Sequence, residues 1–154
     1  MTRLSFPVLP PRLLWLQLAT CALLHWGLGI SLAAPRSQVA GSVGLALGIG
    51  VNLWASRIFE TGHTPIRPDE TPRTLVERGP FRWSRNPMYL GLVALHLGVA
   101  LLVGDALFWV SAVIHATILR VVFVSHEERV MRDAFGEGYL AYSSRVSHWI
   151  GRRL

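Results

Sequence analysis

The stretch RGPFRWSRNPMYLG, residues 78–91, leads from a polar, proline-rich segment into a long apolar run. It contains three arginines and two prolines, so it is both cationic and stiff. Asn86 is a favoured residue just before a helix, and Pro87 is favoured at the first helical position. The stretch therefore predicts a helix that begins at this pair and runs into an apolar environment.

Four apolar segments predict an all-α integral membrane bundle. The chain has 154 residues, of which 51% are hydrophobic and 16% are charged, and this is too apolar for an ordinary soluble domain. Each segment approaches the roughly 20 residues that span a bilayer. A cleavable signal peptide is an alternative for the first segment, although that apolar stretch exceeds the roughly 7 to 15 residues of a signal core. The predicted transmembrane helices are residues 13–34, 39–59, 88–103 and 106–124.

The remaining segments are predicted to lie on the cytoplasmic side of one domain, residues 1–154. Residues 60–87 are rich in proline, threonine and arginine and predict a loop, whereas residues 125–144 predict a helix that is interrupted or turned at FGEG. All 15 basic residues are arginines, and most of them lie in the 60–87 loop and near both termini, whereas only Arg36 lies in the turn after the first segment. The positive-inside rule then places both termini and the loop in the cytoplasm, with the bundle in an inner or plasma membrane.

Composition also limits the partners and the kind of site. The arginines flank apolar runs instead of covering a soluble fold, so no nucleic-acid partner is expected. Cys21 is the single cysteine, which excludes a disulfide within the chain. The segment HEERV lacks the second histidine of the zinc-protease pattern, because the residue four after His126 is Val130, and no metal site is predicted.

Two adjacent carboxylates, Glu127 and Glu128, stand where the fourth apolar segment ends. Glu128 and Arg132 have the spacing of a salt bridge on a helix surface, which is the structural alternative to a functional role. Glu127 has Met131 at the same spacing, so this explanation leaves Glu127 without a partner.

Taken together, the two stretches resemble the isoprenylcysteine carboxyl methyltransferase family and its phospholipid methyltransferase relatives, which are integral membrane enzymes. The resemblance runs from about residue 52 to residue 149. Two positions depart from the family pattern: Asn86 replaces a histidine of many members, and His148 replaces the usual basic residue near the end. The matching residues are Thr64, Pro65, Arg67 and Pro68, then residues 75–91, then Glu127, Glu128, Phe135, Gly136, Tyr139, Tyr142 and Val146.

The resemblance implies that S-adenosylmethionine is the cofactor and that a lipophilic or lipid-attached molecule accepts the methyl group from the membrane side. The cofactor's carboxylate suits an arginine or a helix N-terminus, and its cations suit carboxylates and an aromatic face. An amine acceptor would also need a base, for which a glutamate could serve. The implied catalytic residues are Arg85, Glu127 and Glu128. The implied cofactor-binding residues are Leu75, Val76, Asn86, Pro87, Tyr89, Gly91 and the two glutamates; Arg120, Tyr139 and Tyr142 are assigned to the substrate.

Several alternatives stay open from the sequence. Asn86 and Pro87 could serve only to start a helix, Gly91 could serve helix packing, and Arg82 and Arg85 could hold lipid phosphates. Arg120 either extends its head group to the membrane surface or lines the site. A non-catalytic lipid-binding or assembly protein on the same scaffold is the alternative function. The histidines within apolar segments, His25, His96 and His115, are expected to form hydrogen bonds between helices.

Overall fold

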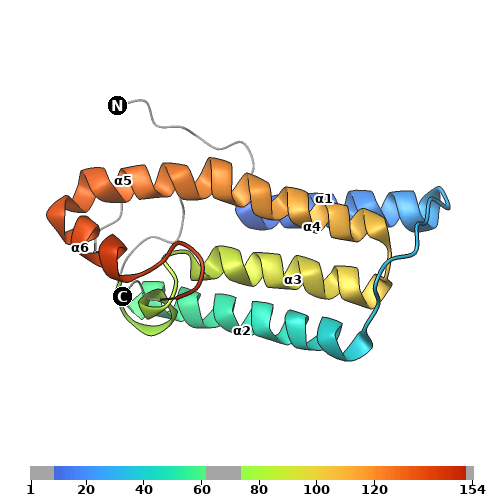
Figure 1. The fold of residues 1–154 in the computed structure, drawn as a ribbon, viewed down its shortest axis with the longest axis horizontal. Helices are drawn as coiled ribbons and strands as arrows, with labels where there is room; N and C mark the ends of the chain where they lie inside the picture. The colour runs from blue at the N-terminus through green and yellow to red at the C-terminus, as the bar shows by residue number, and fades with distance from the viewer. Residues whose placement is uncertain (1–8, 62–73, 152–154) are drawn as a thin grey trace.

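The computed structural model describes residues 9–61 and 74–151, and these residues form an all-helical structure (Figure 1). The predicted all-α class is confirmed. The Thr64, Pro65, Arg67 and Pro68 motif lies outside the described residues.

The helices follow the apolar segments closely, with one difference. Helix α2 is Gln38–Thr61, α3 is Pro87–Val103, and α4 is Ala106–Ile118. Helix α1, Pro10–Ala22, continues as a π-helical turn, Leu23–Gly27, and a 3₁₀ turn, Gly79–Arg82, precedes α3. Helix α4 runs through a π-helical segment, Leu119–Val124, directly into α5, Ser125–Phe135, and α6 is Glu137–Arg145.

The predicted end of the first helix, residue 34, is wrong, because the helix stops at Gly27. Gly29 has a φ of 67°, a left-handed conformation that a helix does not contain. The chain after it lies against the turn between α3 and α4, where Ala34 N donates to Gly104 O (3.0 Å) and Ala106 N donates to Leu32 O (2.8 Å). Tertiary hydrogen bonds replace the last two helical turns that apolar composition alone predicted.

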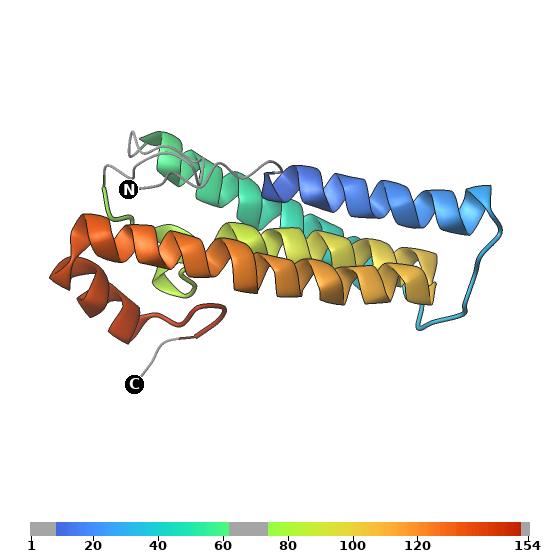
Figure 2. The same ribbon diagram turned by 90° about the horizontal axis from the view of Figure 1, so that it is seen from above.

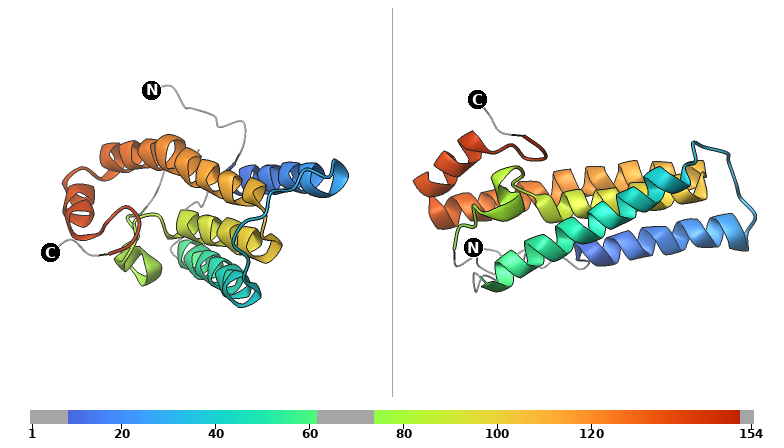
Figure 3. Two further views of the ribbon diagram at one scale, coloured as in Figure 1. Left: turned by 45° about the vertical axis from the view of Figure 1, so that its right-hand side comes forward. Right: turned by 90° about the horizontal axis from the view of Figure 1, so that it is seen from below.

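The predicted interruption at FGEG is confirmed. Gly136 has a φ of 49° and separates α5 from α6. Figures 2 and 3 show that α4 and α5 form one long rod that projects past the start of α3, and that α6 folds back from its end. This return brings the C-terminal part of the chain to the N-terminal end of α3.

Helix α2 packs most extensively on α3, through glycines at the contact. A Cβ atom at Gly48 would lie 2.7 Å from the Gly91 carbonyl oxygen, and one at Gly44 would lie 3.1 Å from the Gly98 Cα. Small residues at these positions let two helix backbones approach closely, as is common between membrane helices. The close contact fixes the position of α3, which carries the first predicted site residues.

The outer faces of the bundle are strongly apolar. Trp15 is 68% exposed, Val39 is 77% exposed and Val113 is 64% exposed. Two helices, Gln38–Thr61 and Ala106–Phe135, are long and apolar enough to cross a membrane, and Pro87–Val103 is a shorter apolar helix. Exposed apolar faces of this extent fit association with a membrane.

Buried polar side chains connect the helices inside the bundle. His115 Nδ1 lies 2.6 Å from Gln17 Oε1, which joins α4 to α1, and the His96 ring of α3 lies 5.2 Å from the His115 ring. His25 Nδ1 lies 2.9 Å from a carboxylate oxygen of Asp105 in the turn between α3 and α4. The expected hydrogen bond between helices is confirmed for His115. It is wrong for His96, since within the described residues neither nitrogen of its buried ring has a hydrogen-bond partner. His25 ties the π-helical turn after α1 to the turn between α3 and α4.

Candidate active site

One end of the bundle brings together the start of α3, the first turn of α5 and the C-terminal strap, which we define as residues 146–151. The Tyr89 hydroxyl donates to Glu127 Oε1 at 2.5 Å. Arg85 Nη1 lies 3.2 Å from Glu128 Oε1, and His148 Nδ1 lies 2.6 Å from the same oxygen. Both predicted constellations therefore meet in space, although dozens of residues separate them along the chain.

Glu127 directs its carboxyl group into the protein. Burial is the main cause that raises its pKa, to about 7, and the neighbouring Glu128 carboxylate adds to this effect. The hydrogen bond from Tyr89 opposes the rise, because it stabilises the ionised form. The Tyr89 ring itself packs beside Phe123, 6.3 Å between ring centres, among apolar side chains. Tyr89 is the neighbour that stabilises the charge of the buried Glu127 carboxyl. A carboxyl group in such apolar surroundings is suited to pair with a cation.

Arg85 and Glu128 form a largely buried ion pair. Their side chains are 6% and 13% exposed, and within the described ranges the buried Arg85 Nε has no hydrogen-bond partner. The surface alternative for Glu128 is wrong: Arg132 Nε donates to the Glu128 main-chain oxygen (3.2 Å), while the carboxylate turns inward to Arg85. An inward N–H donor without a partner is suited to an anionic group such as a carboxylate.

The C-terminal strap runs alongside residues 83–86. Arg85 N donates to Ser147 O (3.1 Å), Gly151 N donates to Trp83 O (3.0 Å), and Asn86 Nδ2 donates to His148 O (3.1 Å). Helix α3 begins at Pro87 as predicted. The Asn86 side chain makes no cap hydrogen bond, and its Nδ2 donates to the His148 carbonyl. Asn86 therefore helps to hold the strap.

Sequence reasoning missed the strap's contribution to the site. Trp149 packs beside the apolar cluster that contains Tyr89 and Phe123, and Ser84 Oγ lies 3.4 Å from His148 O. The departure at His148 from the family pattern was the one available signal, because neither residue period nor spacing links residues 146–151 to the start of α3.

The remaining predicted site residues have varied surroundings. Leu75 packs with Tyr139, Tyr142 and Val146 in a buried cluster, and Val76 follows it in the same irregular segment. The Tyr142 hydroxyl donates to Phe81 O (2.8 Å), and burial raises the pKa of both tyrosines. The return of α6 at Gly136 encloses both tyrosines in protein, and their assignment to the substrate stays a prediction. Arg120 is exposed, as expected if its head group extends to the membrane surface.

Gly91 faces α2 and not the carboxylates. A Cβ atom at this position would collide with the Asn52 amide and would lie 3.0 Å from the Gly48 carbonyl oxygen. The expectation that Gly91 leaves room for a cofactor is therefore wrong, and the packing alternative is the one that the structure shows. The reason is the close α2–α3 contact, which sequence alone did not position.

The described ranges contain no set of ligands for a metal ion. No group of three histidine, cysteine or acidic side chains there lies close enough together to hold a metal ion.

Comparisons with known proteins indicate the family of the chain. An uncharacterized protein of Haemophilus influenzae is 29% identical over 63 residues, which cover 41% of this chain and all of that protein. No solved structure matches the chain. The family model described as phospholipid methyltransferase matches residues 36–138, a stretch that includes α2 to α5 and the residues Arg85, Tyr89, Glu127 and Glu128. Because this match covers more than half of the chain, the protein belongs to the phospholipid methyltransferase family.

Proposed function

We propose that this protein transfers a methyl group from S-adenosylmethionine to a lipophilic or lipid-attached acceptor at the cytoplasmic face of a membrane. The observation that carries the proposal is the meeting of two inward-facing pairs, Tyr89 with Glu127 and Arg85 with Glu128, at one end of an apolar bundle. The family membership supports methyl-transfer chemistry on lipids.

The residues present fit the cofactor's chemical groups. The Glu127 carboxyl, once ionised, suits the sulfonium or ammonium cation, and the unpartnered Arg85 Nε suits the carboxylate. The backbone near Leu75 and Val76 is the proposed neighbour of the adenine. When bound, the cofactor supplies an electrophilic methyl group on a positively charged sulfur.

The protein's own contribution is orientation. Glu128 holds the Arg85 guanidinium, and Tyr89 holds the Glu127 carboxyl, so both groups that would contact the cofactor are positioned before it binds. In-line displacement at a methyl carbon depends mainly on alignment, and positioning of two reactants can contribute on the order of 7 to 11 kcal/mol to a barrier. Pre-positioned groups of this kind are what the reaction requires.

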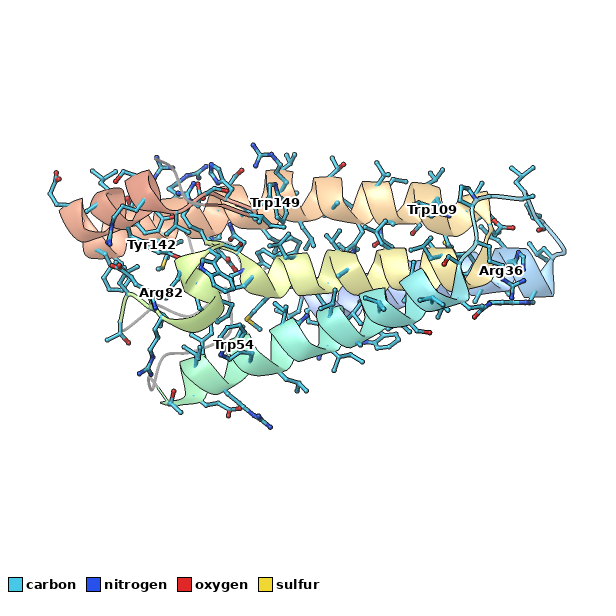
Figure 4. The ribbon with its side chains drawn as sticks, turned by 60° about the horizontal axis from the view of Figure 1, so that its bottom comes forward. Arg36, Trp54, Arg82, Trp109, Tyr142 and Trp149 are labelled. Atoms are coloured by element: carbon cyan, nitrogen blue, oxygen red, sulfur yellow. The ribbon has the colours of Figure 1, made fainter. Side chains whose placement is uncertain are left out.

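The membrane arrangement follows from the same geometry. We propose one domain with four crossings, made by α1 with its π-helical turn, α2, α3 and α4, and with both termini in the cytoplasm. Figure 4 places Arg82 toward the end with Trp54, Tyr142 and Trp149, whereas Arg36 lies with Trp109 toward the opposite end. The arginine-rich end is the cytoplasmic one by the positive-inside rule, so a lipid acceptor would reach the site from the adjoining leaflet.

A matched pair of arginine variants tests the proposal. Arg85→Ala should abolish incorporation of labelled methyl groups into membrane lipids and weaken cofactor binding, while Arg82→Ala, whose side chain is exposed, should change both by less than about twofold. Equal, small effects at both positions would show that these arginines serve only the membrane interface.

Calorimetry with S-adenosylhomocysteine in detergent separates the proposal from its rival. A non-catalytic lipid-binding or assembly protein on this scaffold should not bind the compound even at high micromolar concentration. Binding by the wild type together with labelled lipid product supports the enzyme.

A further inference from the structure

His148 lies outside the residues that the family model matches, and the proposed function does not yet use it. Its side chain is 31% exposed, and its Nδ1 atom lies 2.6 Å from Glu128 Oε1. The contact is close but departs from ideal hydrogen-bond alignment. At this separation the Glu128 carboxylate stabilises a proton on the His148 ring, both as a nearby charge and as a hydrogen-bond acceptor.

The strap holds this ring in place through its backbone. The His148 carbonyl accepts from Asn86 Nδ2 (3.1 Å), and the preceding residue's carbonyl accepts from Arg85 N (3.1 Å). Trp149 anchors the next position beside the Tyr89 cluster. The backbone of the strap therefore holds the ring beside Glu128, and the position of the ring does not depend on the side-chain contact alone.

The chemistry of a carboxylate against Nδ1 is specific. It favours the tautomer that carries its proton on Nδ1, which leaves the Nε2 lone pair on the other side of the ring available to accept a proton. A carboxylate in this position also stabilises the imidazolium that forms, as in the acid–histidine pairs of hydrolases. In this pair His148 is suited to act as a base, and Glu128 is the carboxylate that orients it.

We propose that His148, oriented by Glu128, removes the proton from the methyl acceptor; this inference rests on the proposed function. The acceptor's X–H proton passes to His148 Nε2, and the electron pair left on X forms the bond to the methyl carbon. The bond from that carbon to sulfur breaks, its electron pair stays on sulfur, and the proton leaves His148 for water. The positive charge of the sulfonium is thereby replaced by the charge of the released proton, so the step balances.

The charged groups around the ring suit this role. Burial lowers the pKa of His148, Glu128 raises it, and the guanidinium groups of Arg85 and Arg120 lower it, with a net lowering. The imidazole is therefore largely neutral near neutral pH and can accept a proton.

This role limits the acceptor class. A carboxylate or a thiolate already has an available lone pair and needs no base, whereas an ammonium or a hydroxyl must lose a proton first. His148 therefore points to an acceptor that carries a dissociable proton on nitrogen or oxygen.

The test uses the full-length protein in detergent, with vesicles of an aminophospholipid as one acceptor and a lipophilic thiol as the other. His148→Gln should lower kcat for the amine by about 10²-fold with little change in KM, and added imidazole should restore part of the rate. The loss should shrink at alkaline pH, where the amine deprotonates without help, and the cofactor Kd should stay within about twofold. The thiol should have a cysteine-like pKa of about 8.5, so that it is largely ionised at about pH 9 and transfer to it there is unaffected.

His25→Gln is the matched control, because it also removes a histidine that contacts a carboxylate (2.9 Å), at the opposite end of the bundle. It should leave the pH profile and the ratio of the two acceptors unchanged. A His148→Gln protein with the wild-type rate and pH profile, an equal loss with both acceptors, or a wild type active on the thiol alone would overturn the inference. A wild type that neither binds the cofactor nor transfers methyl groups would instead overturn the proposed function, and the inference with it.

Discussion

The hydroxyl of Tyr89 should control the ionisation of Glu127, and its removal is the most informative single change in the site. The hydroxyl donates to Glu127 Oε1 at 2.5 Å and is the protein's main stabiliser of the ionised carboxyl against burial. Tyr89→Phe removes this donor and keeps the ring that packs beside Phe123. The substitution therefore changes the charge balance of the site with little change in packing.

The magnitude follows from the hydrogen bond. A hydrogen bond to a charged group contributes about 1.5 to 3 kcal/mol, and about 1.4 kcal/mol corresponds to one pH unit. With its pKa at about 7, Glu127 is about half ionised at neutral pH. A rise of about one unit in the pH of half-ionisation leaves roughly one tenth ionised, so affinity for the cationic cofactor should fall about fivefold at pH 7.

Titration of S-adenosylmethionine by calorimetry across roughly pH 6 to pH 9 measures this effect. Wild-type affinity should rise through about pH 7, and the Tyr89→Phe curve should have the same shape but lie at higher pH, with affinity recovered at the alkaline end. Tyr142→Phe is the control, since its hydroxyl bonds to the Phe81 carbonyl and not to a glutamate. A Tyr89→Phe loss that is equal at every pH, or no loss at all, would refute the ionisation argument.

Four further outcomes are expected. Because the folded-state pKa of Glu127 lies above its ordinary 4.5, its stabilising contribution is complete below that pH and is lost as pH rises through about 7; Glu127→Gln should flatten this decline in melting temperature. Gly91→Ala should force α2 and α3 apart at a cost of about 1 to 3 kcal/mol, seen as a lower melting temperature in a protein whose remaining folded fraction binds the cofactor normally. Asp105→Ala should destabilise by about 2 kcal/mol or more, because two backbone amides (2.7 and 3.0 Å) lose their acceptor, and denaturation monitored by circular dichroism would show a wild-type midpoint if this carboxylate were unimportant. Reporter fusions after Leu154 and after Gly29 should report opposite sides of the membrane, and the same side for both would contradict the four-helix arrangement.

The helices and their order were predictable because their signals are local. The length of an apolar run predicts the length of a helix. Pro87 indicates where a helix begins, and a glycine in a polar stretch indicates where a helix is interrupted. The one misjudged helix end, at Gly27, lies where apolar residues continue but the backbone bonds to a distant turn. Composition could not distinguish these two ways of satisfying the same amide groups.

The candidate site was predictable in its residue types and only partly in its geometry. Arg85, Tyr89, Glu127 and Glu128 meet as expected, because oppositely charged and hydrogen-bonding groups at one end of two neighbouring helices have few other partners there. The neighbours of Gly91 were not predictable, because glycine has no side chain whose chemistry would indicate them. Only the packing of α2 shows that Gly91 faces that helix.

The sequence by itself determined that this chain forms apolar helices and that its cations and carboxylates collect at their ends. The tertiary structure decided which partner each polar group takes. Asn86 bonds to a carbonyl 62 residues away instead of capping its own helix, and His148 reaches Glu128, because α6 turns back at Gly136 and carries the strap across the start of α3. Helix formation depends on interactions within a few residues, whereas the choice of a hydrogen-bond partner depends on which distant segment the folded chain brings within about 3 Å.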